Sequence, residues 1–251
     1  MRLAERVAVV TGGGYGIGRA YSLGLAREGA AVVVADLNDE GAKATEHAIK
    51  AAGGRALAVH TDVADEASTA AMAQAAVGQF GRIDVLVNNA ALFTALPLRS
   101  FDEMEAAEWD RVMAVNLRGP FLCCKAVVPH MKQRRYGKII NISSGSIMSG
   151  NPKRIHYVTS KAGLIGFTRS MARALGEYNI CVNSLMPGST ASEGAIAVYG
   201  EQFFQQGYAG RALKRVQQPE DLVGALLYLS SADSDFVTGA ALGVDGGHHM
   251  Y

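Results

Sequence analysis

The sequence predicts one α/β domain of the doubly wound type, in which helices cover both faces of a parallel sheet. Short apolar runs rich in β-branched residues alternate with segments of helical spacing, and the alternation continues along the 251 residues without a linker, repeat or low-complexity tract. Glycines or polar residues follow several of the apolar runs, at the strand ends where open α/β sheets bind ligands. Residues 1–251 are therefore expected to form a single domain with a substantial core.

The first half of the chain contains four short apolar runs with helical patterns between them. Strands are expected at residues 7–10, 31–35, 56–60 and 83–87. Helices are expected at residues 19–28, 40–52, 66–79 and 107–133. The third helix closes at Gly81, and the fourth is expected to be interrupted at Gly119-Pro120, because proline does not continue a regular helix.

The second half continues the alternation. Residues 138–142 form another apolar strand, and a loop rich in glycine and serine then leads to a helix that opens at Tyr157. A helix at residues 219–230 and a strand at 241–244 complete the domain.

Composition excludes several functional classes. The net charge of +1 gives no reason to expect a nucleic acid or an anionic membrane surface as a partner. No apolar run has the length of a membrane span, and the charged N-terminus leaves no visible signal peptide. Cys123, Cys124 and Cys181 fit neither a disulfide framework nor a zinc site, and the six histidines form no ligand set, so we expect buried thiols, a reducing cytoplasm and no metal.

A glycine-rich turn follows the first strand and opens the first helix, with the sequence Thr11-Gly12-Gly13-Gly14-Tyr15-Gly16-Ile17-Gly18. In this context glycines let the backbone approach a pyrophosphate, whose charge is received by amides at the helix N-terminus. Such a turn is weak evidence alone, because many glycine turns are only tight turns. The next strand strengthens the interpretation of this turn as a dinucleotide site.

Asp36 ends the second strand, eighteen residues after Gly18. An acidic residue at about this distance binds the adenosine ribose hydroxyls and repels a 2′-phosphate. Neither Leu37 nor Tyr15 supplies a positive charge for that phosphate. The pattern favours NAD over NADP. The alternative role for Asp36 is to cap the next helix, although Asn38 lies nearer to it.

Tyr157 and Lys161 are four residues apart at the start of a helix, so their side chains share one face. The ordinary pKa of a phenol, about 10, is too high for a base at neutral pH. A positive charge about 4 Å away is worth roughly 4 kcal/mol at an effective dielectric near 20, which favours the phenolate by up to about three pKa units. The pair therefore suits general acid/base catalysis, although Tyr-x-x-x-Lys alone arises often by chance.

Together these motifs resemble the short-chain dehydrogenase/reductase family over essentially the full chain. The segments that carry the resemblance are Thr11-Gly12-x-x-x-Gly16-x-Gly18, Asp36, Asp62-Val63, Asn88-Asn89-Ala90, Asn116, Ser144, Tyr157-x-x-x-Lys161, Asn183, Pro187-Gly188, Thr238-Gly239 and Val244-Asp245-Gly246-Gly247. The resemblance implies a Rossmann-type sheet of about seven parallel strands and an active-site tetrad of Asn, Ser, Tyr and Lys.

The resemblance also implies a role for each member of the tetrad. Tyr157 would take the proton from the substrate hydroxyl, and Ser144, thirteen residues before it, would hold the substrate oxygen. Lys161 would lower the pKa of Tyr157 and hold the nicotinamide ribose. Asn116 would position a water that links Lys161 to solvent. The hydride would pass from the carbinol carbon to the nicotinamide.

The implied cofactor site draws on several strand ends. It comprises Gly12, Tyr15, Gly16, Ile17, Gly18, Asp36, Leu37, Asp62, Val63, Asn89, Ala90, Ala91, Tyr157, Lys161, Pro187, Gly188 and Thr190. Ala91 departs from the family, which usually has glycine there. The residues after Gly188 also depart from the usual pattern, so either Thr190 or Ser192 is expected to contact the amide of the cofactor.

Lys153 and Arg154 are the most individual feature of the chain, because the family commonly has apolar or small residues just before the catalytic tyrosine. One hypothesis is that Arg154 or Lys153 binds an anionic group of a substrate that Ser144 and Tyr157 also contact, since arginine binds carboxylates bidentately. The alternative is a solvated loop pair.

Residues 189–215 show weak periodicity and contain four aromatic side chains, and they follow the sixth strand, where the family has a mobile substrate lid. We expect an aromatic cover that excludes water, a short helix that buries its own apolar face, or both. The resemblance further implies a homotetramer.

The sequence therefore predicts a cytoplasmic NAD-dependent oxidoreductase that interconverts a secondary alcohol and its carbonyl. Its small-molecule substrate is expected to be an alcohol, a sugar-derived polyol or an anionic hydroxy compound. A 3-oxoacyl thioester reductase is an alternative that Asp36 disfavours, because those enzymes usually use NADPH. A cofactor-binding protein without catalysis is disfavoured by the intact tetrad, and epimerases or dehydratases with the same Tyr-Lys pair usually need a longer chain.

Overall fold

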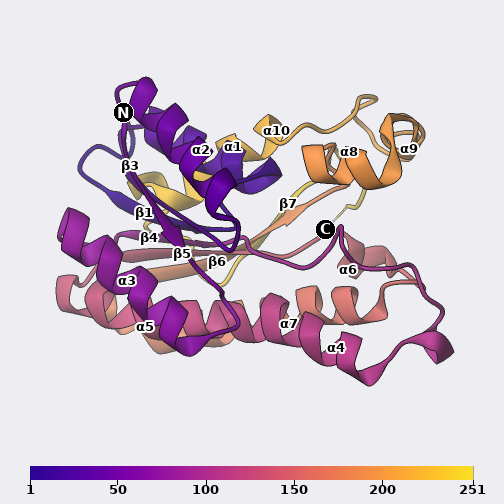
Figure 1. Cartoon of the computed structure of the whole chain (residues 1–251), viewed down its shortest axis with the longest axis horizontal. Coiled ribbons are helices and arrows are strands. Elements are labelled where there is room, and N and C mark those ends of the chain that lie inside the picture. The colour runs from indigo at the N-terminus through magenta and orange to yellow at the C-terminus, as the bar shows by residue number, and fades with distance from the viewer. Residues whose placement is uncertain (251) are drawn as a thin grey trace.

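A parallel sheet organises the protein, whose structure is a computed structural model that describes residues 1–250. The sheet has seven strands in the order β3-β2-β1-β4-β5-β6-β7 (Figure 1). The strands are Val7–Thr11 (β1), Ala31–Asp36 (β2), Arg55–His60 (β3), Val85–Asn88 (β4), Gly137–Ile142 (β5), Ile180–Pro187 (β6) and Ala241–Val244 (β7). The strand order reverses between β1 and β4, which creates a crevice at their carboxyl ends. The predicted doubly wound parallel sheet is confirmed.

One face of the sheet is covered by α1 (Gly16–Arg27), α2 (Asp39–Ala51) and α10 (Glu220–Ser230). These helices bury apolar side chains such as Leu25, Ile49 and Leu226 against the sheet. Burying a side chain of this size is worth roughly 1.5–3 kcal/mol. The continuous apolar character of the inner strands follows from this arrangement, because both of their faces are covered.

The other face is covered by α3 (Glu66–Phe80), α5 (Gly119–Arg134) and α7 (Ile155–Leu175). Cys123 and Cys124 lie in this core layer, and Cys181 is also buried, so the expected burial of the thiols is confirmed. Burial raises the pKa of the Cys124 thiol to about 12, and it raises the pKa of Cys123 as well. These thiols therefore serve as small apolar groups.

The helical region before β5 is continuous, so the expected interruption at Gly119-Pro120 is wrong. Helix α4 (Ala106–Met113) passes into a π-helical segment, Ala114–Arg118, and then into α5. Pro120 stands in the first turn of α5, directly after the change in hydrogen-bond spacing, where its missing N–H does not break the helix. Residues 106–134 have the length and hydropathy of a membrane span, but half of their most apolar window is buried inside the protein, so this is weak evidence for a span.

Two short helices follow β6 at the carboxyl edge of the sheet. They are α8 (Glu193–Tyr199) and α9 (Glu201–Gly207), and Figure 1 shows them standing apart from the sheet, above the loop that carries α6 (Ser146–Ser149). Phe204 packs against Ala191 and Ala195 in a small cluster of its own. The segment therefore buries an apolar face of its own, as one of the two expectations for residues 189–215 required.

Candidate active site

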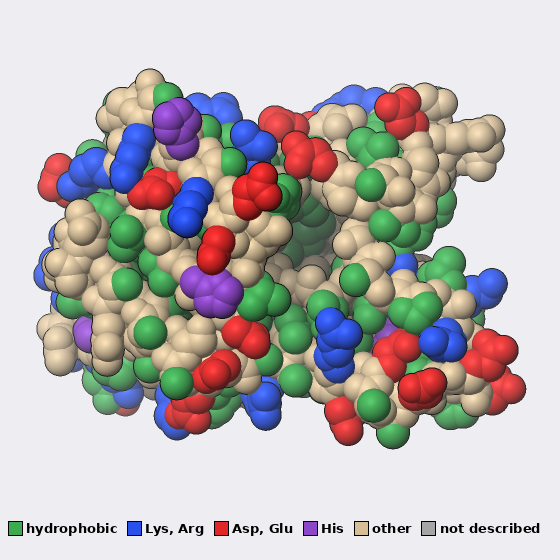
Figure 2. All heavy atoms as spheres, in the orientation of Figure 1, with side chains coloured by type: hydrophobic (Ala, Val, Ile, Leu, Met, Phe, Trp, Pro, Cys, Tyr) green, Lys and Arg blue, Asp and Glu red, His purple; other side chains and the backbone are tan. Residues whose placement is uncertain are grey.

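A recess opens at the carboxyl edge of the sheet. Figure 2 shows it between the part of the molecule that carries α1 and α2 and the part that carries α8 and α9. The loops after β1, β4, β5 and β6 all begin at this edge, because the carboxyl ends of parallel strands lie at the same edge of a sheet. The sequence motifs after these strands therefore meet around one recess.

The glycine turn between β1 and α1 leaves no room for side chains. A Cβ on Gly18 would lie 1.9 Å from the carbonyl oxygen of Gly12, and Gly12 has a φ of 61°, in the left-handed region that favours glycine. Tyr15, the N-cap of α1, makes no side-chain hydrogen bond to the first turn, which contains no acidic residue. The amides of the helix N-terminus, which includes Ile17, are thus available to an anion. This cradle fits the pyrophosphate of a dinucleotide.

Asp36 lies at the end of β2 and faces the glycine turn. Its Oδ2 accepts a hydrogen bond from the Gly14 amide (2.9 Å), and its Oδ1 accepts one from the Asn38 amide (2.9 Å). Asn38 caps α2 by accepting a hydrogen bond from the Gly41 amide (3.0 Å). The alternative role of Asp36 as the cap is therefore wrong. Leu37 is 63% exposed beside it.

The two asparagines after β4 tie the edge of the sheet together. The Nδ2 of Asn89 donates to the carbonyl oxygens of Thr11 and Gly12, at 3.0 Å each. The Nδ2 of Asn88 donates to the Oδ1 of Asn141 on β5 (2.9 Å). They pin neighbouring strands and hold the glycine turn in place.

The remaining cofactor candidates lie around the same edge. Asp62 follows β3, and its Oδ1 accepts from the Ala64 amide (2.8 Å), while Val63 is buried against Gly119. Ala91 is exposed at the start of the loop after β4. Ala90 lies under the glycine turn, with its Cα 2.9 Å from the position of a Cβ on Gly12.

Thr190 and Ser192 both follow the end of β6, where Pro187 and Gly188 turn the chain. The Thr190 hydroxyl donates to the Gly188 carbonyl (3.0 Å). The Cβ of Ser192 lies 3.2 Å from the position of a Cβ on Gly16, so Ser192 sits against the glycine turn. Which of the two contacts the cofactor amide stays a prediction.

Strand β5 and helix α7 bring three members of the expected tetrad together. Ser144 follows β5, and Tyr157 and Lys161 lie near the start of α7. The Nζ of Lys161 is 5.8 Å from the centre of the Tyr157 ring and donates to the carbonyl oxygen of Ile142 (2.7 Å). The hydroxyl of Ser143 donates to the Lys161 carbonyl (2.7 Å). Ser143 therefore supports α7, and Ser144 is the serine that interacts with Tyr157.

Asn116 lies in the π-helical segment, a feature that often occurs at functional sites. Its Oδ1 accepts from the Leu92 amide (2.8 Å), and its Nδ2 donates to the Leu92 carbonyl (3.1 Å) and the Ser160 hydroxyl (3.3 Å). Asn116 thus fastens the loop after β4 to α7. Its water link to Lys161 stays a prediction.

The titration of the Tyr-Lys pair differs from the expectation. Burial raises the pKa of Tyr157, while hydrogen bonding to Ser144 and the positive charge of Arg154 act in the opposite direction. Burial lowers the pKa of Lys161 to about 7. Lys161 is not among the groups that shift the pKa of Tyr157, so its expected effect on that pKa stays a prediction. Both side chains are buried, and burial disfavours the charged form of each.

The two basic residues before Tyr157 have different environments. Lys153 is exposed, whereas Arg154 is only 2% exposed. The Arg154 guanidinium donates to the carbonyl oxygens of Phe93 (2.8 Å) and Leu96 (3.4 Å) and to the hydroxyl of Tyr199 on α8. The alternative of a solvated pair is therefore wrong for Arg154.

Sequence reasoning missed two residues of this site. Phe93 packs on the Tyr157 ring at a centroid distance of 4.9 Å, and Ser160 bonds to Asn116. Phe93 follows a strand end that carries two asparagines, which was a usable signal. Ser160 offers none, because a serine in the first turns of a helix is common.

Comparisons with known proteins agree with this geometry. A family model described as enoyl-(acyl carrier protein) reductase matches residues 12–249. The trans-4-hydroxycyclohexanecarboxylate dehydrogenase of Sinomonas cyclohexanicum is 40% identical over 98% of this chain and 93% of its own. The (2S)-[(R)-hydroxy(phenyl)methyl]succinyl-CoA dehydrogenase subunit BbsD of Thauera aromatica is 37% identical over 100% of this chain and 99% of its own. A crystal structure described as a short-chain alcohol dehydrogenase from Sinorhizobium meliloti superposes with a TM-score of 0.92 at 32% identity, covering 98% and 97% of the two chains.

The chain belongs to the short-chain dehydrogenase/reductase family. As a short-chain dehydrogenase/reductase, it is an oxidoreductase that interconverts alcohol and carbonyl groups. The resemblance seen in the sequence motifs is thus confirmed at the level of family, fold and reaction type.

Proposed function

We propose that this short-chain dehydrogenase/reductase is an NAD-dependent enzyme that oxidises a secondary alcohol, with Asn116, Ser144, Tyr157 and Lys161 as its catalytic residues. One observation carries the proposal: the Tyr157 phenol, the Ser144 side chain and the Lys161 side chain come together after β5 and at the start of α7, in the same parallel sheet whose strand β1 leads into the glycine cradle. A cofactor-binding protein without catalysis would not need this convergence.

In this mechanism Ser144 holds the substrate oxygen by a hydrogen bond. Tyr157 takes the hydroxyl proton in the oxidation direction and returns it in the reduction direction. Lys161, fixed by the Ile142 carbonyl at 2.7 Å, stays within reach of the Tyr157 ring and exchanges protons near neutral pH. Asn116 holds the loop after β4 against α7 through Leu92 and Ser160. The bound cofactor supplies the hydride acceptor.

The preference for NAD over NADP rests on Asp36. Its carboxylate faces the Gly14 amide at the end of β2, where a 2′-phosphate would meet negative charge. The neighbouring Leu37 carries no charge to offset it, and Asp39 adds further negative charge at the start of α2. The same argument disfavours a 3-oxoacyl thioester reductase that uses NADPH.

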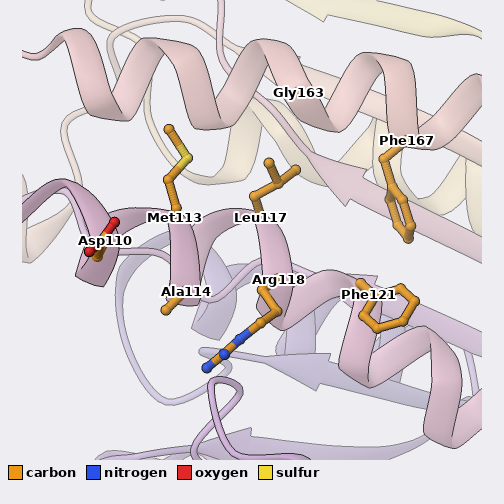
Figure 3. Close-up of a pocket in the computed structure, with 8 residues that line it drawn as sticks. All are labelled: Asp110, Met113, Ala114, Leu117, Arg118, Phe121, Gly163 and Phe167. Carbon is orange, nitrogen blue, oxygen red and sulfur yellow. The ribbon is translucent and has the colours of Figure 1, made fainter.

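The proposal extends to a cytoplasmic homotetramer. An apolar hollow of about 660 Å³ lies where α4 and α5 meet α7 (Figure 3). Met113 and Leu117 point toward α7, Phe121 lies opposite Phe167, and Phe121 is 48% exposed. An exposed apolar hollow on the helix that carries Tyr157 supports contact with a second copy of the chain. Sedimentation velocity tests the assembly, and a monomer would overturn this part of the proposal.

Two relatives indicate which class of substrate to test first. Dehydrogenases of trans- and of cis-4-hydroxycyclohexanecarboxylate are each 40% identical to this chain. A matched panel for the first screen therefore consists of 4-hydroxycyclohexanecarboxylate, its primary amide and cyclohexanol, together with sugar alcohols.

The decisive experiment measures NADH formation with this panel. We expect turnover with NAD, a lower kcat/KM with NADP, and loss of turnover in Tyr157→Phe with retained NAD binding. Tyr228→Phe, a partly exposed tyrosine on α10, is the matched control and should keep full activity. Activity retained in Tyr157→Phe would refute the mechanism, and a higher kcat/KM with NADP would refute the cofactor assignment.

A further inference from the structure

Arg154 is a buried cation without a carboxylate partner. It is the largest of the fully buried side chains, and its three acceptors, the Phe93 and Leu96 carbonyls and the Tyr199 hydroxyl, are all neutral. Among residues 1–250, no carboxylate lies within ion-pair distance of Arg154. Burial lowers its pKa, opposed only by the nearby Tyr157 phenol.

Two other buried cations of the described chain, Lys138 and Arg211, have acidic neighbours. Lys138 is 1% exposed and forms an ion pair with Asp235 at 2.8 Å. Arg211 is influenced by Asp245 and Asp221, which both raise its pKa. A buried charge that lacks such a partner is strongly destabilising. The burial of Arg154 therefore lowers the stability of the fold, and a structural role alone does not account for this loss of stability.

An acidic group close to the start of α7 is already used. Glu108 on α4 contacts the Nε2 of His156 through one carboxylate oxygen (2.9 Å) and the Nε of Arg99 through the other (3.2 Å). Both of its oxygens are thus engaged away from Arg154. No carboxylate of the described chain therefore neutralises Arg154.

Arg154 also lies close to the catalytic tyrosine. Its guanidinium carbon is 4.3 Å from the centre of the Phe93 ring, and the same ring packs on Tyr157 at 4.9 Å. Tyr199, at the end of α8, also packs on the guanidinium, with its ring centre 5.3 Å from the guanidinium carbon. One aromatic ring thus connects Arg154 to the catalytic tyrosine, and the helix after β6 closes over it.

We propose that Arg154 binds the carboxylate of the substrate, so that the enzyme acts on hydroxy acids whose carboxylate and carbinol carbon lie at opposite ends of the substrate. This inference rests on the proposed alcohol dehydrogenase function. A guanidinium has five N–H donors, and residues of the described chain accept from three positions, so donors remain for a carboxylate. Movement of α8 withdraws the Tyr199 hydroxyl and admits the acid. The carboxylate would stay unchanged, Tyr157 would take the proton of the substrate hydroxyl, and a bound nicotinamide would supply the hydride acceptor.

The test compares kcat/KM for 4-hydroxycyclohexanecarboxylate and its primary amide in the wild type, Arg154→Gln and Arg154→Lys. We expect Arg154→Gln to lower kcat/KM for the acid at least about tenfold more than for the amide, because a charge-assisted hydrogen bond is lost. Arg154→Lys should retain part of the preference. Lys153→Gln removes the same charge one residue earlier, at an exposed position, and should leave both values unchanged.

A readout on the wild type alone covers the case in which Arg154 variants do not fold. Cyclohexanecarboxylate, which has no reacting hydroxyl, should inhibit the wild type at least about tenfold more tightly than cyclohexanecarboxamide. Equal inhibition by the two, or equal losses for acid and amide in Arg154→Gln, would overturn the role of Arg154. If the wild type oxidises no alcohol of the panel with NAD or NADP, the proposed function itself fails, which is a separate outcome.

Discussion

The buried lysine of the active site makes the stability of the protein depend on pH in a defined window. Burial lowers the pKa of Lys161 to about 7 in the folded protein, whereas the ordinary value is 10.5. Between these values the unfolded chain binds more protons, so stability rises with pH from about 7 to about 10.5 and is lowest below pH 7. Each pKa unit is worth about 1.4 kcal/mol, so raising the pH from about 6 to about 9 should add roughly 2–3 kcal/mol through this group.

The substitution Lys161→Met isolates this contribution, because methionine does not titrate. Loss of the hydrogen bond to the Ile142 carbonyl costs about 1–3 kcal/mol at every pH. The difference in unfolding free energy between variant and wild type should therefore shift in favour of the variant by roughly 2–3 kcal/mol between pH 9 and pH 6.

Urea unfolding followed by circular dichroism at pH 6 and pH 9 measures this shift, at one protein concentration and without cofactor. Lys43→Met is the matched control, because Lys43 is exposed on α2 and its replacement should give the same difference at both pH values. If the Lys161→Met difference is also the same at both pH values, Lys161 does not titrate near 7 in the fold and the reasoning is refuted.

Three further predictions concern the cradle, a helix end and the catalytic proton. Gly18→Ala should weaken NAD binding at least about tenfold in calorimetry, because its Cβ meets the Gly12 carbonyl oxygen at 1.9 Å; unchanged binding would contradict the cradle. Gly81→Ala should lower the unfolding free energy by about 1 kcal/mol, because Gly81 ends α3 with a φ of 76°, where alanine is strained. Gly78→Ala is the control: Gly78 lies inside the same helix and faces open space, so this substitution should raise the unfolding free energy by about 0.5–1 kcal/mol. Initial rates of alcohol oxidation should rise with pH and those of carbonyl reduction should fall, because burial raises the pKa of Tyr157 and oxidation needs its phenolate; parallel profiles in the two directions would exclude Tyr157 as the proton carrier.

Local sequence patterns were sufficient to predict the architecture and much of the candidate site. Apolar runs such as Val7–Thr11 are legible in sequence because a strand covered on both faces has to be apolar along its whole length. The spacing of Tyr157 and Lys161 is also local, since one turn of helix brings the two side chains to the same face. The glycine turn belongs to the same class, because its backbone angles follow from the residues themselves.

Other properties depend on which segments fold over one another. Lys153 and Arg154 are adjacent and equally basic, yet one is exposed and the other is enclosed by the Phe93 loop and α8, which lie about 60 and 45 residues away in the chain. The direction of the Tyr157 pKa shift likewise follows from burial, and burial cannot be predicted from the spacing of residues along a helix.

The sequence by itself determined the strands of the parallel sheet, the tight glycine turn after β1 and the shared helical face of Tyr157 and Lys161, because each depends on residues that are neighbours along the chain. The tertiary structure alone decided that Arg154 is buried without a carboxylate partner, that Asn116 fastens the loop after β4 to α7, and that burial lowers the pKa of Lys161. The physical reason is common to all three. Desolvation and hydrogen bonding are set by atoms from distant segments, which meet only when the chain has folded.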